Sequence, residues 1–367
     1  MQEKNIAVVG AGVIGRTHVD AIRQASGVRL SGIVEPGPGG RAYAEENGCR
    51  LHANLDELIA SRPDGVVVAT PNETHAALAI ELLAAGIPVL VEKPLATTVA
   101  EAASILKASE KAGVPVLTAH HRRYNERILK ARQLAGSRDF GHLVIGSVLC
   151  SLKKPASYFD VAWRTLPGSG GPLLINMIHE IDLLRFLFGE VASVNATQSN
   201  AERGLPVEDT AGAILRFEKG GIITLAVSDA AAAPWAWDIS ANENPGRFPA
   251  HPVSSHHFCG SDGAFSLPDL TFWFHGGEKS WTEKMQQRAE AVPDKDAYIA
   301  QISHFAEVID GKATPRCSGL DGARNIAVIE AIRRSAETGK TVELDLGFGT
   351  VAPDMNVPEE AIHEQRP

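Results

Sequence analysis

The N-terminal pattern of strand, glycine-rich turn and helix is the sequence feature that most constrains the fold. Residues 6–9 form an apolar run typical of a buried strand, Gly10-x-Gly12-x-x-Gly15 follows at once, and residues 16–24 have a helical pattern. In this context the first glycine allows a tight turn, the second lets a pyrophosphate approach the backbone, and the third lets helix and strand pack closely. The helix N-terminus offers free N–H groups to phosphates. The pattern predicts a dinucleotide site contacted by Gly10, Gly12, Val13, Ile14 and Gly15.

An acidic residue ends the next predicted strand. Residues 29–34 are apolar-rich, and Glu35 follows them about 20 residues beyond the glycines. A carboxylate at this place accepts hydrogen bonds from the ribose hydroxyls and repels a 2′-phosphate. We therefore expect NAD rather than NADP as the cofactor, although Arg41, beyond a loop of prolines and glycines, could still reach a phosphate.

Strands and helices alternate through the first third of the chain. Apolar strand patterns within residues 65–70, 84–94 and 115–119 alternate with helical patterns over residues 73–85 and 98–112. Such short alternation implies right-handed crossovers and a doubly wound parallel sheet. The sequence therefore predicts an NAD-binding Rossmann domain over residues 1–122.

One of these strand patterns ends in an ionisable pair, Glu92-Lys93, followed by Pro94. In an open α/β sheet the carboxyl ends of the strands form the ligand crevice, so a lysine at that end is directed at a ligand. The alternative is a surface lysine that pairs only with Glu92.

The second half of the chain has a different pattern of apolar segments. Longer segments rich in branched residues, separated by turns, occur at residues 143–152, 191–200, 211–217 and 222–228, and one strong helical pattern covers residues 174–188. These segments predict an α/β domain with an open, mainly antiparallel sheet. We assign residues 123–346 to this substrate-binding and oligomerisation domain and residues 347–367 to a C-terminal tail.

Composition excludes several classes of protein. The formal net charge of −9 argues against a nucleic-acid or anionic-membrane partner, because both require a basic surface. The four cysteines are far apart, and neither a signal sequence nor an apolar run of about 18 residues occurs, so we expect a cytoplasmic protein. His251, His256, His257 and Cys259 have no metal-site spacing, so we expect no metal.

Three motifs together carry a resemblance to a known family. The glycine motif, Ala69-Thr70-Pro71-Asn72-x-x-His75 and Glu92-Lys93-Pro94, in this order, resemble the Gfo/Idh/MocA oxidoreductases. The resemblance implies oxidation of a secondary hydroxyl on a sugar, polyol or related ring by a nicotinamide cofactor, with Lys93 in contact with the substrate oxygen. It also implies cofactor contacts from Thr70, Pro71, Asn72, His75, Glu92 and Lys93.

The helix over residues 174–188 extends the resemblance to the second domain. His179 lies three residues after Asn176 and three before Asp182, so the three are expected on one helix face, and the family pattern has a His with Asp three residues later. Many relatives carry a second catalytic Asp four residues before this His, where the present chain has Ile175. We expect Lys93 and His179 to be catalytic and Asn176 to bind substrate, with Asp182 either orienting the imidazole or serving the structure.

The loop ahead of that helix contains Tyr158, Trp163 and Arg164, and two arginines, Arg122 and Arg123, follow the last Rossmann strand. We expect Tyr158, Trp163, Arg164 and Arg123 to bind the substrate, with the arginines favouring an anionic group. The alternative is that Trp163 is a core residue and that the arginines only pair with carboxylates.

These features predict an NAD-dependent dehydrogenase that oxidises a secondary hydroxyl of a sugar, sugar acid or cyclic polyol. A carboxylated cyclic dihydrodiol is the alternative substrate, and a catalytically inactive nicotinamide-binding sensor is the alternative from another class. The open sheet has one face without an obvious partner, so we expect a homodimer or homotetramer formed through it.

Overall fold

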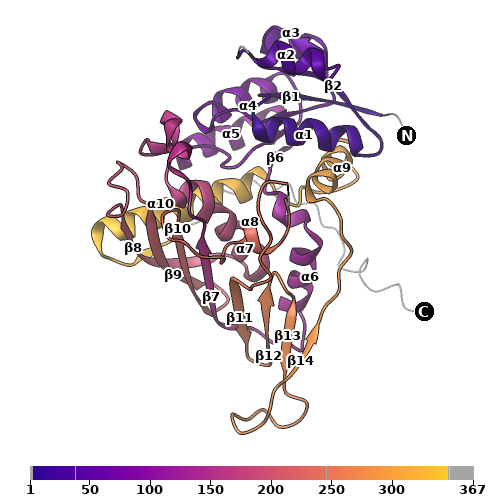
Figure 1. The fold of residues 1–367 in the computed structure, drawn as a ribbon. Helices are drawn as coiled ribbons and strands as arrows, with labels where there is room; N and C mark the ends of the chain where they lie inside the picture. Colours follow the sequence, from indigo (N-terminus) through magenta and orange to yellow (C-terminus); the bar gives the residue numbers. More distant parts are fainter. Residues whose placement is uncertain (1–2, 38, 245, 346, 348–367) are drawn as a thin grey trace, which may run out of the picture.

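The structure is a computed structural model that describes residues 3–37, 39–244, 246–345 and 347. The chain forms two sheets with helices around and between them (Figure 1). Except for Gly347, the predicted tail over residues 347–367 lies outside the described residues.

The first sheet is parallel throughout, with strand order β3-β2-β1-β4-β5-β6. Its strands are β1 (Lys4–Val9), β2 (Val28–Val34), β3 (Leu51–His52), β4 (Gly65–Val68), β5 (Val89–Val91) and β6 (Val116–Thr118). The helices between them are α1 (Val13–Gln24), α2 (Gly39–Glu46), α3 (Leu55–Ala60), α4 (His75–Ala84) and α5 (Val99–Ala112). The order reverses between β1 and β4, as in a doubly wound sheet, which confirms the predicted Rossmann architecture.

The glycine turn between β1 and α1 is tightly packed at two of its three glycines. Gly10 has φ +94°, and a Cβ there would lie 2.5 Å from the carbonyl oxygen of Ala69. A Cβ at Gly15 would lie 1.9 Å from the carbonyl oxygen of Gly10, whereas a Cβ at Gly12 would meet nothing within 4 Å. The first and third glycines therefore hold turn, helix and strand together, and the second leaves open space at the helix N-terminus.

The second sheet is larger and mixed, with strand order β14-β13-β12-β11-β7-β10-β9-β8-β15. Its strands are β7 (Leu143–Ser151), β8 (Val191–Ser199), β9 (Thr210–Phe217), β10 (Ile222–Ser228), β11 (His256–Gly260), β12 (Gly263–Leu267), β13 (Thr271–Phe274), β14 (Gln286–Ala289) and β15 (Val342–Glu343). Neighbouring strands are antiparallel except for the parallel pair β7 and β10. The predicted mainly antiparallel sheet is confirmed, but the sequence did not predict the parallel pair of β7 and β10.

The helix expected over residues 174–188 begins with a π turn. Residues Leu173–Met177 form this turn, and α7 (Ile178–Phe188) continues it as a regular α-helix. In a π turn the hydrogen-bonded ring gains one residue relative to an α-helix, so the side chains before and after it are rotated away from regular helical spacing. Such turns are frequent at functional sites.

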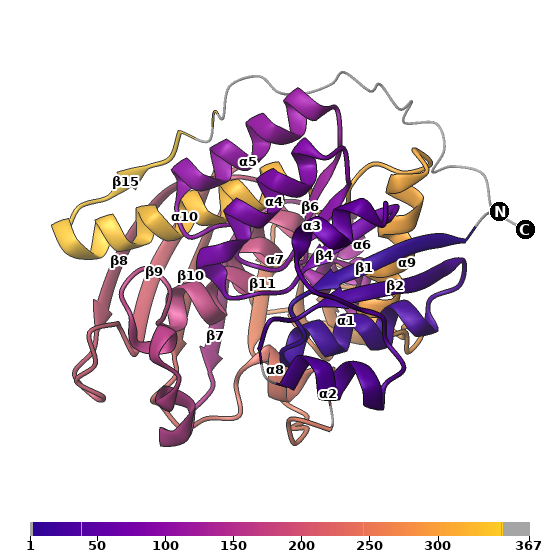
Figure 2. The same cartoon turned by 90° about the horizontal axis from the view of Figure 1, so that it is seen from above.

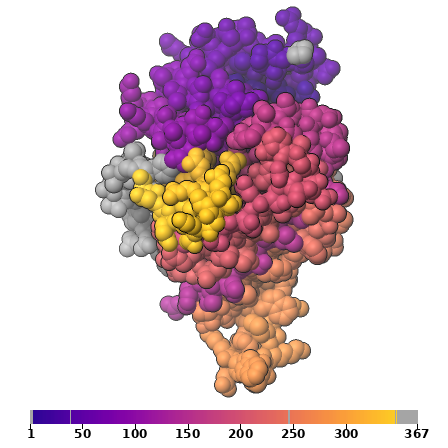
Figure 3. Space-filling model, turned by 90° about the vertical axis from the view of Figure 1, so that its left-hand side faces the viewer, coloured from indigo at the N-terminus to yellow at the C-terminus, as the bar shows by residue number. Residues whose placement is uncertain are grey.

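Two helices late in the chain return to the Rossmann domain. Helix α9 (Ala297–Ile309) packs against α1, and α10 (Gly319–Thr338) packs against α5 and β6 on one side and β8 on the other. Figures 2 and 3 show α10, in yellow, between the first domain and the second sheet. One continuous apolar core therefore extends across both domains.

The glycine turn yields a stability prediction. Gly15→Ala should destabilise the fold by about 2 kcal/mol or more, because its Cβ overlaps the carbonyl oxygen of Gly10 and the turn must shift. Gly12→Ala is the matched control and should cost roughly 1 kcal/mol or less, since open space surrounds it. The melting temperatures of the two variants, measured by calorimetry, test this prediction. Equal melting temperatures would show that the close packing at Gly15 is not required.

Candidate active site

The carboxyl ends of β4 and β5 are joined at one histidine. His75 begins α4 and is buried, with Nδ1 2.7 Å from the carbonyl oxygen of Pro94 and Nε2 2.9 Å from that of Thr70. Burial lowers the pKa of His75, so the neutral ring can donate only to one of these oxygens. His75 therefore holds the segment containing Thr70 against the segment that follows Lys93.

Glu92 is a buried anchor of the same strand end. Its Oε1 lies 2.8 Å from Nε2 of His18 on α1, and its Oε2 accepts the backbone N–H of Lys93 at 3.0 Å. Burial opposes ionisation, but the hydrogen bond from His18 keeps the pKa of Glu92 below its usual value. Both carboxylate oxygens are thus used within the protein, and Glu92 positions Lys93 instead of extending toward a ligand.

The Lys93 ammonium reaches across to the second domain. Its Nζ donates to the backbone carbonyl of Ile175, in the π turn, at 3.3 Å. Burial lowers the pKa of Lys93, and the neighbouring Glu92 carboxylate opposes the shift only in part. Ile175 therefore contributes its main-chain carbonyl to this lysine and not its side chain.

His179 lies in the first turn of α7 among other histidines. Its ring centroid is 5.9 Å from that of His120 and 5.8 Å from that of His121, both in edge-to-face geometry. Its Nδ1 is buried without a hydrogen-bond partner among the described residues. Burial lowers the pKa of His179 well below its usual value, and the charges of Lys93 and Arg122 lower it further. The imidazole is therefore neutral near neutral pH.

Asn176 has a partner that the sequence analysis missed. Its Oδ1 accepts a hydrogen bond from Nζ of Lys154 at 2.8 Å, and the same Nζ lies 3.5 Å from Oδ2 of Asp229. Lys154 is buried although the adjacent Lys153 is exposed. Its place just beyond β7, next to the predicted substrate loop, was the only available signal.

Asp182 and Arg123 do not occupy the substrate-facing positions expected of them. The Arg123 guanidinium binds both carboxylate oxygens of Asp182, at 2.8 to 3.1 Å, and Asn325 donates to the same carboxylate at 2.8 Å. Burial would raise the pKa of Asp182, but Arg123 holds it at about 2. Both side chains are buried, so the structural alternative for Asp182 is the one observed, and Arg123 is its counter-ion.

A second buried ion pair lies beside the first. Arg122 donates to Oε1 of Glu180 at 2.7 Å and to Asp238 at 3.2 Å, while His256 contacts Oε2 of Glu180 at 2.7 Å. Breaking a buried pair by removing one partner typically costs about 3 to 5 kcal/mol. These two ion pairs therefore fix η2 (His121–Tyr124), which carries both arginines, against α7.

The predicted substrate loop forms a cluster of its own. The Arg164 guanidinium lies 4.0 Å above the ring of Tyr158 and 5.6 Å from that of Trp163, and it donates to the Tyr158 carbonyl at 2.7 Å. Nζ of Lys154 lies 4.6 Å from the centre of the same Tyr158 ring. Tyr158 therefore connects this loop to the pair of Lys154 and Asn176.

The glycine turn has the features that a dinucleotide requires. Glu35 accepts the N–H of Ala11 at 2.7 Å and that of Gly37 at 2.8 Å, so its carboxylate lies beside the turn. Gly12 adjoins open space, and Val13 is 73% exposed at the start of α1. Pro71 is exposed, and Asn72 and Ile14 are half-buried, so they remain accessible to a ligand. These residues fit NAD.

The described residues offer neither a metal site nor a membrane-spanning helix. They contain no cluster of histidine, cysteine and carboxylate side chains that could hold a metal ion. Within the same residues, every helix is too short or too polar to cross a membrane.

Comparison with known proteins covers both domains. Residues 4–120 match the model of the oxidoreductase family with an NAD-binding Rossmann fold, and residues 139–344 match that of its C-terminal alpha/beta domain. Inositol 2-dehydrogenase 2 of Saccharopolyspora erythraea is 27% identical over 93% of this chain and 96% of its own. D-apiose dehydrogenase of Paraburkholderia graminis is 29% identical over 92% of this chain and 89% of its own.

A solved structure agrees with these matches. The WlbA dehydrogenase from Bordetella pertussis, in complex with NADH and UDP-GlcNAcA, superposes with a TM-score of 0.76 at 25% identity, over 94% of this chain and 99% of its own. Fold, motifs and both family models thus point the same way. The chain belongs to the Gfo/Idh/MocA family of NAD-binding oxidoreductases.

Proposed function

We propose that this protein is an NAD-dependent dehydrogenase that oxidises a secondary hydroxyl of a sugar, sugar acid or cyclic polyol. The observation that carries the proposal is that Lys93 lies near enough to His179 for its charge to lower the pKa of the imidazole. The lysine ends a Rossmann strand and contacts the π turn, and the histidine lies four residues beyond that contact on the same helix. A partly buried ammonium can stabilise the developing alkoxide, and a neutral imidazole can accept the hydroxyl proton.

The proposed chemistry divides between these two side chains. When bound, NAD accepts the hydride from the carbinol carbon. Lys93 donates a hydrogen bond to the hydroxyl oxygen and stabilises the negative charge that develops there. His179 enters the reaction neutral, because its pKa is held low, and it accepts the hydroxyl proton.

Two alternatives remain distinct from this proposal. A carboxylated cyclic dihydrodiol would use the same chemistry, and the amide of Asn176, held by Lys154, supports this alternative because it can donate to a carboxylate. NADH production with panels of sugars and of cyclic dihydrodiol acids separates these substrates. A catalytically inactive sensor would bind NAD but turn over neither panel.

The catalytic pair gives the first kinetic prediction. Lys93→Ala and His179→Ala should each lower kcat by on the order of 100-fold or more, while NAD affinity changes little. Lys107→Ala, on the exposed side of α5, is the control and should keep wild-type rates. If either site variant retains near-wild-type kcat on the substrate, that residue has no place in the mechanism.

The pH profile of kcat/KM assigns the two roles. Activity should fall at low pH, where His179 becomes protonated, and at high pH, where Lys93 loses its proton. The pKa of each group is lowered, so both falls in activity should occur at a lower pH than the usual pKa of histidine or lysine implies. Residual activity of His179→Ala should therefore lack the acidic limb, and that of Lys93→Ala the alkaline limb. The opposite assignment of limbs would exchange the roles.

Glu35 should set the choice of cofactor. We expect the wild-type protein to prefer NAD over NADP by at least roughly tenfold in kcat/KM, because the carboxylate favours free ribose hydroxyls and opposes a 2′-phosphate. In Glu35→Gln the side chain can still accept the N–H of Ala11 but has no charge, so the preference for NAD over NADP should become smaller. Equal use of both cofactors by the wild-type protein would refute this role.

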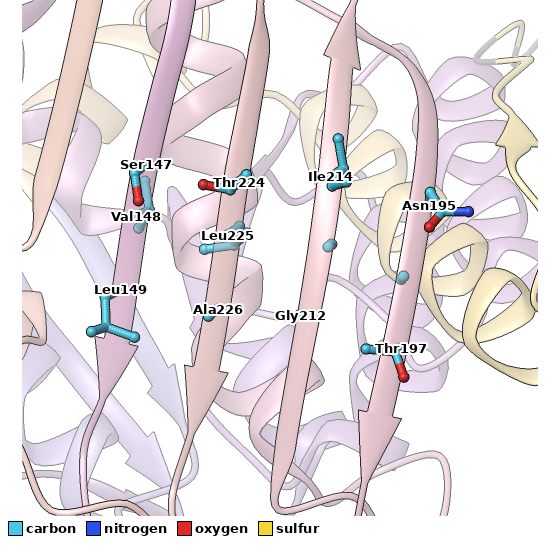
Figure 4. A pocket seen from close by; sticks show the side chains of 12 residues that line it. Ser147, Val148, Leu149, Asn195, Thr197, Gly212, Ile214, Thr224, Leu225 and Ala226 are labelled. Atoms are coloured by element: carbon cyan, nitrogen blue, oxygen red, sulfur yellow. The ribbon is translucent and has the colours of Figure 1, made fainter.

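The outer face of the second sheet supports a dimer or a dimer of dimers. Side chains of β7, β8, β9 and β10 on this face surround a shallow hollow of about 450 Å³, with the helices behind the sheet (Figure 4). Cross-strand neighbours Ile145 and Ile222 are about half exposed on it, as is Ile214 beside Thr224. This hollow lies on the sheet and not at Lys93, so we assign it to subunit contact and not to catalysis.

Light scattering tests the assembly. The wild-type protein should be a dimer or tetramer at micromolar concentration, and Ile214→Glu should dissociate it by placing a charge in the apolar contact. Ala103→Glu, on the exposed surface of α5, should leave the assembly intact. A monomeric wild-type protein would contradict the proposed interface.

A further inference from the structure

We infer that Lys154 fixes the Asn176 amide with its N–H groups toward the substrate, so that the site selects a substrate carrying a carboxylate near the reacting hydroxyl. The inference rests on the proposed dehydrogenase function and specifies its substrate class. Lys154 is a positioning residue in this account, and Asn176 and Lys93 make the contacts.

The orientation of Asn176 follows from the chemistry of its partner. An amide can turn over to exchange its oxygen and nitrogen, but an ammonium group only donates hydrogen bonds. Nζ of Lys154, 2.8 Å away, therefore requires the carbonyl oxygen of Asn176 on its side. The NH₂ group must then occupy the other end of the amide.

That NH₂ group is available to a ligand. Among the residues that the structure describes, none accepts a hydrogen bond from Nδ2 of Asn176, and the residue is only half-buried. The Lys93 ammonium lies next to this amide, because it donates to the carbonyl of Ile175, the residue before Asn176 in the π turn. Both groups are donors, so Asn176 and Lys93 together can offer hydrogen bonds to an acceptor on the ligand.

The charge around Lys154 favours an anion in the same place. Lys154 and Arg203 share a single buried carboxylate, that of Asp229, with Nζ at 3.5 Å and the Arg203 Nε at 2.9 Å. Protonated Lys154, Arg203 and Asp229 together carry a net charge of +1, whereas the Lys93 charge is faced by the Glu92 carboxylate. Near Lys93, Arg122 binds the carboxylates of both Asp238 and Glu180, so the positive charge is greatest around Lys154 and Arg203.

Burial makes this positive charge more receptive to a ligand. It lowers the pKa of Lys154 to about 8 although Asp229 acts to raise it, and the Lys93 charge contributes to the lowering. A carboxylate placed beside the two lysines would stabilise both ammonium groups. A hydroxyl group would add no charge, so a neutral polyol gains less from the same donors.

A carboxylate therefore fits the donors of Asn176 and Lys93 better than a hydroxyl. Its two oxygens only accept hydrogen bonds, which matches donors from Asn176 and Lys93. Charge-assisted hydrogen bonds are also roughly twice as strong as neutral ones. The expected substrate is a hydroxy acid in which the carboxylate lies close enough to the reacting hydroxyl for these donors to contact both.

Matched pairs of acids and neutral compounds test the substrate class. The probes are gluconate with glucitol and galacturonate with galactose, each assayed for NAD reduction. Of the two acids, the one that is the better substrate should have a kcat/KM at least roughly tenfold higher than that of its neutral counterpart. A preference for the neutral members would overturn the inference and leave the dehydrogenase function intact.

Two variants test the residues. Asn176→Asp keeps an oxygen toward Lys154 but replaces the outward NH₂ by a charged oxygen. It should lower kcat/KM for the acid by on the order of 100-fold and for the neutral partner by less than about tenfold. Lys154→Met should raise KM for the acid, Lys154→Arg should restore part of the loss, and Lys153→Met, the adjacent exposed lysine, should change nothing.

A binding measurement covers the case in which no probe is turned over. Calorimetric titration of the NAD-loaded protein with gluconate and galacturonate should show binding that Asn176→Asp weakens while its melting temperature stays near wild type. Equal losses for acid and neutral probes, or no binding of either acid, would refute the inference. Failure of every probe to reduce NAD, with acid binding retained, would instead count against the dehydrogenase function.

Discussion

The hydrogen bond from the Lys93 ammonium to the Ile175 carbonyl joins the two domains at the point where the chemistry is proposed. The lysine can reach this carbonyl because its backbone is held on both sides, by the bond from His18 to Glu92 and by the contacts of His75 to Pro94 and Thr70. A single backbone oxygen at 3.3 Å carries no charge to balance this partly buried cation. In the proposed mechanism Lys93 exchanges that contact for an oxygen of the substrate, and the buried ion pairs of Arg122 and Arg123 hold α7 in place.

Much of this arrangement could be predicted from the sequence because local patterns determine it. The apolar strand before Gly10 and the helix that contains Gly15 must be joined by a tight turn, because a Cβ at either glycine would overlap a backbone oxygen. The strand β5 ends at Val91, two residues before Lys93, and so places the lysine at the carboxyl edge of the sheet. The longer branched segments of the second half predicted the open sheet for the same reason. Each of these features depends on residues close together in the chain.

The remaining features depend on packing between distant segments. Regular helical spacing predicts that Asn176, His179 and Asp182 share one face, but Asn176 lies in the π turn and departs from that spacing. His179 and Asp182 both lie in α7 and share the neighbour His120. Asn176 meets Lys154, His179 lies among histidines, and Asp182 binds Arg123, which is 59 residues away in sequence. No local pattern specifies these pairings. Nor could the residue type reveal that Ile175 acts through its carbonyl, because any amino acid provides that atom.

The most direct test of the account is a crystal structure of the protein with NAD and a bound substrate hydroxyl. We predict that the hydroxyl oxygen lies within hydrogen-bond distance of Nζ of Lys93 and of a ring nitrogen of His179, with the nicotinamide ring against the reacting carbon and the pyrophosphate at Gly12. A substrate bound away from these two side chains, or a nicotinamide ring that does not reach the end of β5, would contradict the central claim.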